Sequence, residues 1–184
     1  MTTRIQQNDL IESVAAALQY ISYYHPADYI QHLARAYERE QSPAAKDAMA
    51  QILTNSKMSA TGHRPICQDT GLAVLFVEIG QDVHVVGGGL REAINEGVRQ
   101  GYREGYLRKS IVNDPVFKRK NTGDNTPPVI HLRIVPGTQI HVWVVPKGGG
   151  SENMSTLGML KPAQGVEGVR QFVVDAVSRA GANP

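Results

Sequence analysis

The sequence predicts an α/β (α+β) fold: a mixed, mainly antiparallel sheet of about four strands packed with helices and preceded by a three-helix N-terminal segment. Apolar residues recur at helical spacing between residue 8 and about residue 60 and again near the C-terminus, and apolar runs of strand length lie between these regions. With 184 residues the chain is long enough to bury a core. No domain-scale linker interrupts it, so we predict that residues 1–184 form a single domain.

Three consecutive helices are predicted first. The first begins at a capping box formed by Asp9 and Glu12, and Pro26 ends its pattern because a proline ring does not fit a helix interior. Ser42 followed by Pro43 marks the start of the third helix. The side chains expected to face the core are Leu10, Val14, Leu18 and Ile21 in the first helix, Tyr29, Ile30, Leu33, Ala36 and Tyr37 in the second, and Ala45, Ala48, Met49, Ile52 and Leu53 in the third.

Strands are predicted after residue 60. The continuous apolar run Leu72–Ile79 is typical of a buried strand, and Val83–Val86 of a shorter one. Three glycines, at 87–89, then separate this strand from a helix. In that helix the spacing near four places four apolar side chains on one face: Leu90, Ile94, Val98 and Tyr102.

A hairpin and a final helix complete the predicted elements. Val129–Val135 alternates, with Ile130, Leu132 and Ile134 on one face. Pro136-Gly137 marks a tight connection, after which Thr138–Val145 returns as the partner strand of a hairpin. The last helix covers Val166–Ala180, and Gly181–Pro184 ends it. Its side chains expected to face inward are Val169, Phe172, Val173, Ala176 and Val177.

Composition excludes several classes of protein. A net charge of +2 gives no nucleic-acid footprint, and the basic run 118–120 is simplest as a solvated loop. No apolar stretch approaches the roughly 20 residues that span a bilayer, and the polar N-terminus lacks the apolar run of a signal peptide. We therefore expect neither nucleic acid nor membrane as a partner. One cysteine rules out an internal disulfide, and with no export signal we expect a cytoplasmic protein.

Cys67 is the first candidate for chemistry. An isolated cysteine is usually a small buried hydrophobe, but Cys67 lies in the polar loop Arg64–Gly71, where Arg64 would favour the thiolate. A nucleophilic cysteine would need a base, for which the chain offers His63, His84, His131 and His141, but no papain-like or caspase-like context supports it. Metal ligation is the other interpretation, and one thiolate would need further ligands from elsewhere.

Two polar loops come later in the chain. The cluster Asn121–Pro128 has the composition of any turn and means little by itself. The triple glycine 148–150, preceded by Lys147 and followed by Ser151-Glu152-Asn153, is less ordinary. It follows a predicted strand and precedes a short helix, so its amides are suited to cradle a carboxylate or phosphate. It is neither a Walker loop nor a dinucleotide fingerprint.

Arg108 is the second candidate for chemistry. The sequence places it at the end of a helix, where a cation complements the negative end of the helix dipole. The alternative is a bidentate clamp on a substrate carboxylate, to which the planar guanidinium is suited. The residues alone leave both interpretations open.

Three stretches, in order and spacing, resemble the N-terminal half of the iron-sulfur (class I) fumarases: GHRPICQDTG, KNTGDNTPP and VVPKGGGSEN. The family also includes the alpha subunits of two-chain fumarases and L-tartrate dehydratases and some mesaconases. The resemblance covers essentially the whole chain. It implies a hydro-lyase that interconverts fumarate and L-malate with a [4Fe-4S] cluster held by three cysteines, with one iron left to bind substrate.

The resemblance also implies roles for single residues. Cys67 matches the first of the three cluster ligands, and Gln68 and Asp69 match the substrate-contacting pair that follows it. Arg108 matches the arginine that grips a substrate carboxylate, and Gly150 a backbone contact in the glycine loop. It implies no residues for acid-base chemistry in this part, and it implies a homodimer as in relatives.

The chain departs from the family pattern because the second and third cluster cysteines and the C-terminal domain are absent. We therefore expect a fragment of a longer enzyme, inactive by itself and unable to retain the cluster alone. Three alternatives stay open: an alpha subunit that takes the missing ligands from a beta-type chain, a non-catalytic scaffold, or an anion-binding interaction module. The choice among fumarate, mesaconate and tartrate is also open.

Overall fold

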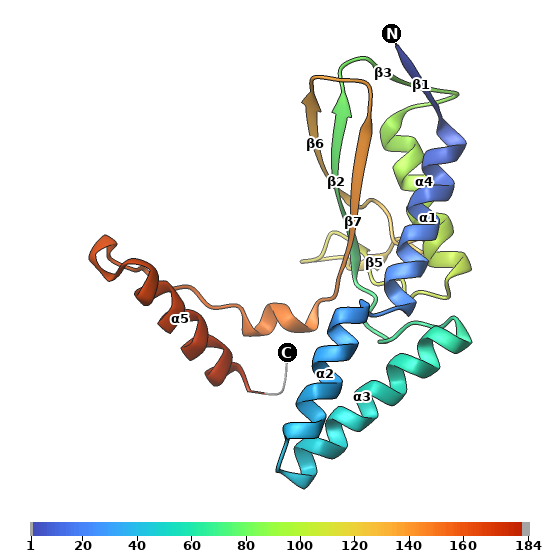
Figure 1. The fold of residues 1–184 in the computed structure, drawn as a ribbon. Helices are drawn as coiled ribbons and strands as arrows, with labels where there is room; N and C mark the ends of the chain where they lie inside the picture. Colours follow the sequence, from blue (N-terminus) through green and yellow to red (C-terminus); the bar gives the residue numbers. More distant parts are fainter. Residues whose placement is uncertain (1, 182–184) are drawn as a thin grey trace. The chain divides into compact units, whose positions relative to one another are not determined.

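The computed structural model describes residues 2–181, except for the side chains of Ser151 and Glu152. Contacts divide the chain into two compact units, Met1–Lys147 and Gly148–Pro184. The first unit contains, in order, β1 (Thr3–Gln6), α1 (Gln7–Tyr23), α2 (Ala27–Arg39), α3 (Pro43–Gly62), β2 (Leu72–Gly80), β3 (Val83–Val86), α4 (Leu90–Glu104), β4 (Val112–Asn113), β5 (Lys120–Asn121), β6 (Val129–Val135) and β7 (Ile140–Lys147) (Figure 1). The single-domain assignment stays a prediction.

The α/β class and the three leading helices are confirmed, and the largest sheet is mixed. That sheet has three strands in the order β6-β2-β7, with β6 parallel and β7 antiparallel to β2. Two smaller pairs, β1 with β3 and β4 with β5, accompany it. β1, β4 and β5 were not predicted, because the first is largely polar and the other two are only two residues long.

The predicted hairpin between Val129–Val135 and Thr138–Val145 is wrong. Both strands exist, but β2 lies between them and pairs with each (Figure 1). The apolar run of β2 suits the centre of a sheet. The connection between β6 and β7 needs to cross about 10 Å, two strand spacings, which a four-residue segment can span. It wraps the end of β2, where Gly80, Gln81 and Asp82 donate backbone hydrogen bonds of 2.8, 2.8 and 3.1 Å to this turn and the end of β6.

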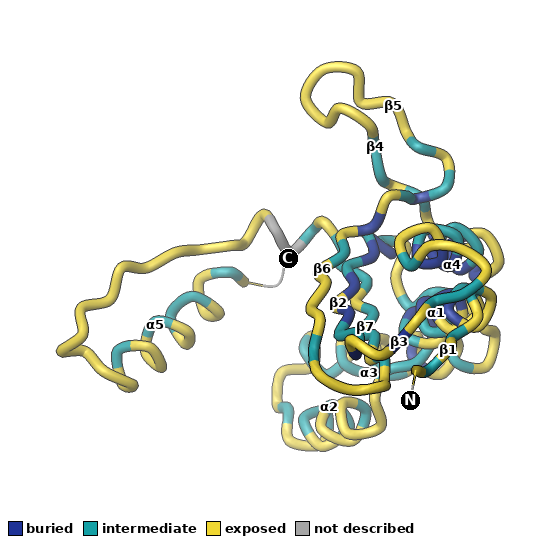
Figure 2. Tube along the Cα trace, turned by 90° about the horizontal axis from the view of Figure 1, so that it is seen from above, coloured by how far each residue is buried: buried dark blue, intermediate teal, exposed yellow. Residues whose placement is uncertain are grey.

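The core lies between this sheet and the helix pair α1 and α4, which pack side by side over one sheet face (Figures 1 and 2). The pattern predicted for these helices is confirmed, since Leu18, Ile94, Val98 and Tyr102 are completely buried. Close approach of the helices depends on Gly97, where an added Cβ would lie 2.8 Å from the Ile11 carbonyl oxygen. On the sheet side the core includes Ala73, Leu75 and Val77 of β2.

Two details of the predicted N-terminal helices differ. α1 begins directly after Gln6, with no side-chain cap, so the capping box of Asp9 and Glu12 is wrong. β1 continues directly into α1, so the pairing of β1 with β3 sets the direction in which the chain enters the helix. The breaks at Pro26 and Ser42-Pro43 are confirmed. The side chains predicted to be inward in α2 and α3 are partly or largely exposed, because these helices pack mainly on each other rather than over the sheet.

The second unit contains two short 3-10 helices, η1 (Gly150–Met154) and η2 (Pro162–Gln164), and then α5 (Gly165–Ala180). The final helix is confirmed, but its predicted inward face is wrong: Val169, Val173 and Val177 are 52%, 52% and 69% exposed. Within this unit too few elements are present to cover that face. The predicted end at Gly181–Pro184 falls partly outside the described residues.

We expect Gly80→Ala to destabilise the protein by about 1–3 kcal/mol, since overpacking against backbone has few ways to relax. A Cβ at this position would lie 2.3 Å from the carbonyl oxygen of Gly137. Urea unfolding measures the effect, and Gly62→Ala is the control because a Cβ there makes only ordinary contacts, the nearest at 3.9 Å. An unchanged midpoint for Gly80→Ala would contradict the wrapped arrangement of the β6–β7 connection.

Candidate active site

Cys67 lies in an exposed loop between α3 and β2, and neighbouring helices anchor that loop. The Ile66 amide donates to the Ser22 carbonyl oxygen of α1 at 2.9 Å, and the Asn55 side chain of α3 donates to the Ile66 carbonyl oxygen at 2.8 Å. The Asp69 amide donates to Cys67 Sγ at 3.4 Å. The sulfur is therefore held at the surface with one amide hydrogen bond, so the interpretation as a small buried hydrophobe does not apply.

A small depression opens beside this sulfur. It has a volume of about 130 Å³, and Cys67, Asp69 and Thr70 line it together with Pro146 at the end of β7. The other lining residues belong to α1 and to the anchored part of the loop: Ile21, Ser22 and Ile66. The loop, the sheet end and α1 therefore meet at a concave surface with a thiol and a carboxylate in it.

Arg108 lies four residues beyond the end of α4 at Glu104, so its predicted place at a helix C-terminus is wrong. Tyr106, with φ of 54°, takes the left-handed conformation, and the chain leaves the helix there. The Arg108 guanidinium reaches Asp69, with Nη2 at 3.2 Å from Oδ1. Because the arginine side chain is 53% exposed, this ion pair contributes little to stability. Since Arg108 lies beyond the helix, its interaction with the Cys67 loop replaces the predicted interaction with the helix dipole.

Two buried side chains join the Cys67 loop to the rest of the site. The Tyr102 hydroxyl of α4 donates to the carbonyl oxygens of Thr70 and Gly71, at 2.8 and 3.1 Å. Burial, and to a smaller extent the charge of Asp69, raises the pKa of Tyr102 to about 12, so the hydroxyl keeps its proton at neutral pH. Asn125 donates from Nδ2 to the Gly71 carbonyl oxygen at 3.0 Å. Buried donors from Tyr102 and Asn125 therefore hold the C-terminal end of the loop in place.

Sequence reasoning missed these two roles. Tyr102 was expected only as part of a helix face, and Asn125 only as one polar residue in a turn. Both are completely buried. A signal for Asn125 existed in its residue type, since asparagine tolerates the left-handed backbone (here φ of 62°) and offers both a donor and an acceptor. No sequence pattern shows that these groups are buried.

Asp124, the neighbour of Asn125, fastens the same turn to α4. It accepts hydrogen bonds from the amide and hydroxyl of Thr126 and from Arg99 Nε at 2.9 Å, and Arg99 also pairs with Glu96. Burial raises the pKa of Asp124, but the bonds from Thr126 and Arg99 outweigh this and bring the pKa to about 2. The turn is therefore held by a charged group that stays ionised in mild acid.

This depressed pKa predicts a pH dependence. A carboxylate with a folded pKa near 2 and an ordinary value of 3.8 adds stability that is complete above about pH 4 and is lost as the pH falls through 2. We expect Asp124→Asn to cost about 1–2 kcal/mol at pH 7, after allowance for partial exposure, and to flatten the loss of stability between pH 4 and 2. Urea unfolding at pH 7, 4, 3 and 2 measures both, and parallel curves for the two proteins would contradict the assignment.

The nucleophilic alternative requires an imidazole base that is hydrogen-bonded to the Cys67 sulfur. Cys67 Sγ accepts a hydrogen bond from the Asp69 amide, and none joins it to an imidazole in the part of the chain that the structure describes. The four histidines lie in other settings: His63 stacks on Tyr23, His131 on Phe76 and His141 on Trp143, and His84 lies in β3. The nucleophilic alternative therefore has no hydrogen-bonded base among the described residues.

Among residues 2–181, with Ser151 and Glu152 left out, no three or more His, Cys, Asp or Glu side chains gather as a metal site. Gln68 is exposed beside Cys67. Gly150 lies in the second unit at the start of η1, so its predicted place near Cys67, Asp69 and Arg108 stays a prediction.

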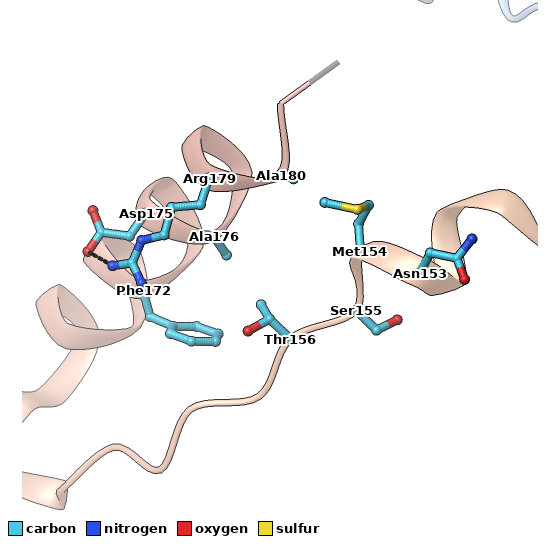
Figure 3. Close-up of a pocket in the computed structure, with 9 residues that line it drawn as sticks. All are labelled: Asn153, Met154, Ser155, Thr156, Phe172, Asp175, Ala176, Arg179 and Ala180. Carbon is cyan, nitrogen blue, oxygen red and sulfur yellow. Dashed lines mark ion pairs between the residues drawn. The ribbon is translucent and has the colours of Figure 1, made fainter. Parts of the chain in front are cut away.

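The second unit has a depression of its own, of about 260 Å³, between α5 and the end of η1 with the segment that follows it (Figure 3). Arg179 in its wall forms an ion pair with Asp175, drawn as a dashed line in Figure 3, with 3.6 Å between Nη2 and Oδ2. Its lining contains none of the five predicted site residues.

Comparison with known proteins identifies the family to which this chain belongs. The family model for fumarate hydratase (Fumerase) matches residues 11–184. The chain therefore belongs to the Fumerase family. It is 35% identical to the class I anaerobic fumarate hydratase of Escherichia coli K12 over 85% of this chain and 29% of that protein. It is 30% identical to an L(+)-tartrate dehydratase alpha subunit of Escherichia coli UTI89 over 96% of this chain and 58% of that subunit.

A further relative, from Methanocaldococcus jannaschii, is provisionally named an L(+)-tartrate dehydratase alpha subunit. It is 36% identical over 88% of this chain and 58% of its own length. The chain thus spans little more than half of the alpha subunits that it matches and under a third of the fumarate hydratase. Within the described residues, no helix combines the length and apolar character needed to cross a membrane.

Proposed function

We propose that the complete protein is a [4Fe-4S] hydro-lyase that reversibly hydrates fumarate to L-malate, and that this chain supplies one cluster cysteine and part of the dicarboxylate site. One observation carries the proposal: in a Fumerase-family chain, Asp69 and the exposed Cys67 line one depression, and Asp69 forms an ion pair with Arg108. A thiol that can hold metal and a cation that can hold a carboxylate are the groups that this reaction needs at one place.

The carboxylate-binding role falls to Arg108. Its guanidinium has five N–H donors, of which the ion pair with Asp69 uses one, so the planar fork can take a substrate carboxylate while Asp69 keeps it oriented. Gln68 and Asp69 are proposed to contact the substrate from the loop, and Gly150 to contribute a backbone amide from the second unit. The residues that move protons are not among those that we assign.

Cys67 fits the cluster as one ligand. Its sulfur is exposed and accepts an amide hydrogen bond, the kind of contact that tunes cluster sulfurs in iron-sulfur proteins. When bound, the cluster supplies a Lewis acid for a hydroxyl and a carboxylate of the substrate. Since the described residues offer no three-ligand site, the other ligands must come from outside them. We therefore propose that the isolated chain is inactive and retains no cluster.

The missing ligands have two proposed sources, a C-terminal domain of the same protein or a beta-type chain. Relatives named as alpha subunits favour the second, and the fumarate hydratase, of which this chain covers 29%, favours the first. A homodimer of the complete protein and a cytoplasmic location belong to the same proposal.

A second substrate is favoured by a specific observation. The chain matches 96% of its length to an L(+)-tartrate dehydratase alpha subunit. Tartrate differs from malate by one hydroxyl, and a site that hydrogen-bonds this group discriminates strongly, whereas an apolar pocket does not. L(+)-tartrate dehydration is therefore the alternative reaction, and it uses the same Cys67 and Arg108.

The complete protein, produced with any companion chain and reconstituted anaerobically with iron and sulfide, tests the proposal. We expect hydration of fumarate to exceed conversion of mesaconate and L-tartrate by at least about tenfold in kcat/KM. A preference for L-tartrate would establish the alternative reaction. No activity on any of the three, in a preparation with a full cluster, would contradict hydro-lyase function.

A further inference from the structure

We propose that Asn125 is a positioning residue that sets the Cys67 loop against the Arg108 segment. The inference rests on the proposed function, since it concerns the same site. Asn125 belongs to the turn cluster 121–128, which the proposed chemistry does not use. Its side chain is completely buried, and it bonds both parts of the site at once.

The first connection runs to the Cys67 loop. Asn125 Nδ2 donates to the Gly71 carbonyl oxygen at 3.0 Å, at the point where the loop becomes β2. Gly71 has a φ of 63°, a left-handed conformation that lets the chain turn from the loop into the strand. The Asn125 donor therefore fixes the end of the loop that carries Cys67 and Asp69.

The second connection runs to the Arg108 segment. Asn125 Oδ1 accepts from the amides of Ser110 and Ile111, at 2.8 and 3.0 Å. These residues have no helix or long strand to satisfy their amides, since α4 has ended and β4 begins only at Val112. The carboxamide takes the place of a missing secondary structure just beyond Arg108.

We call the three hydrogen bonds of the Asn125 side chain, to Gly71, Ser110 and Ile111, the Asn125 clamp. Other contacts agree with it. The Thr70 hydroxyl donates to the Arg108 carbonyl oxygen at 2.9 Å, so the two segments also touch directly. The Tyr102 hydroxyl donates two hydrogen bonds to the loop and so ties the loop to α4. Asn125 differs from both because one side chain serves the loop with its donor and the Arg108 segment with its acceptor. Without the Asn125 side chain, the distance between Cys67 and Arg108 should become more variable, while the hydrophobic core stays packed.

Two substitutions separate the two halves of the clamp. Asn125→Asp keeps the oxygen acceptor at neutral pH and removes the Nδ2 donor. Asn125→Gly removes both groups and still accepts the left-handed backbone, so backbone strain does not confuse the result. The matched control is Val14→Ala, a core substitution in α1 that lowers global stability without touching either segment.

The readouts are local and need no catalysis. Cys67 is the single cysteine of the chain, so a nitroxide attached to it reports the mobility of the loop by electron paramagnetic resonance. Hydrogen exchange at Ser110 and Ile111, followed by NMR, reports the other half of the clamp. Urea unfolding of the same samples gives the global stability against which both are compared.

We expect Asn125→Asp to make the label on Cys67 more mobile while Ser110 and Ile111 keep their protection. We expect Asn125→Gly to do the same to the label and to speed exchange at Ser110 and Ile111 by at least about tenfold. Val14→Ala should change neither. A label as immobile in both Asn125 variants as in the parent, or equally mobile in Val14→Ala at equal stability, would overturn the proposal. Because no substrate is involved, this result is independent of the test of the proposed function.

Discussion

Cys67→Ser is expected to abolish fumarate hydration by the complete protein, with at least a thousandfold loss of kcat and loss of most bound iron and sulfide. A serine hydroxyl is a poor ligand for iron compared with a thiolate. The side chain is exposed at the loop surface, so the same change should leave the urea midpoint of this chain nearly unchanged. Iron and sulfide analysis, steady-state kinetics and urea unfolding measure the three effects.

The combination of results makes this a sharp test. Loss of activity with loss of stability would indicate a folding defect instead of ligation. Retention of both cluster and activity in Cys67→Ser would show that the ligand assignment is wrong. Because the chain contains one cysteine, no neighbouring thiol of its own can replace Cys67 in the variant.

Arg108→Gln should have the second largest effect, a fall in kcat/KM of about 10²–10³. The estimate follows from the loss of a charge-assisted, bidentate contact with a carboxylate, each hydrogen bond of which is worth about 1.5–3 kcal/mol. We expect most of the fall as a rise in KM, since Arg108 is assigned to binding. Arg108→Lys should recover only part of it, because an ammonium cannot form the planar fork.

Arg103→Gln is the matched control for Arg108. Arg103 is also exposed and also paired with a carboxylate, Glu104 at 2.9 Å, but it lies in the last turn of α4. This variant should keep kcat and KM within about twofold, since surface pairs contribute little. Equal kinetic losses in Arg103→Gln and Arg108→Gln would mean that overall charge, and not a specific clamp, explains the effect.

The elements of the fold were predictable where local periodicity decides them. α1 and α4 carry apolar residues on one face, and both helices cover the sheet as predicted. The pairing of strands was not predictable, because Pro136-Gly137 has the local character of a hairpin turn while the long-range partner β2 takes the place between the two strands. The apolar spacing in α2, α3 and α5 predicted the helices correctly. It did not predict how far their apolar side chains are buried, because burial depends on which elements pack against a helix.

The candidate site was predictable in part for the same reason. Cys67, Asp69 and Arg108 were found through motifs, and the structure brings Asp69 and Arg108 within 3.2 Å across 39 positions of sequence. The resemblance implied this proximity, but spacing alone could not. The buried roles of Tyr102 and Asn125 depend on the three-dimensional path of two loops, so composition gave only a helix face and a turn.

The most direct test of the central claim is a crystal structure of the complete protein, reconstituted anaerobically and crystallised with L-malate. We expect Cys67 Sγ bound to a cluster iron and the Arg108 guanidinium paired with a malate carboxylate, with Asp69 still beside it. A cluster held without Cys67, or malate bound away from Arg108 and Asp69, would contradict the account.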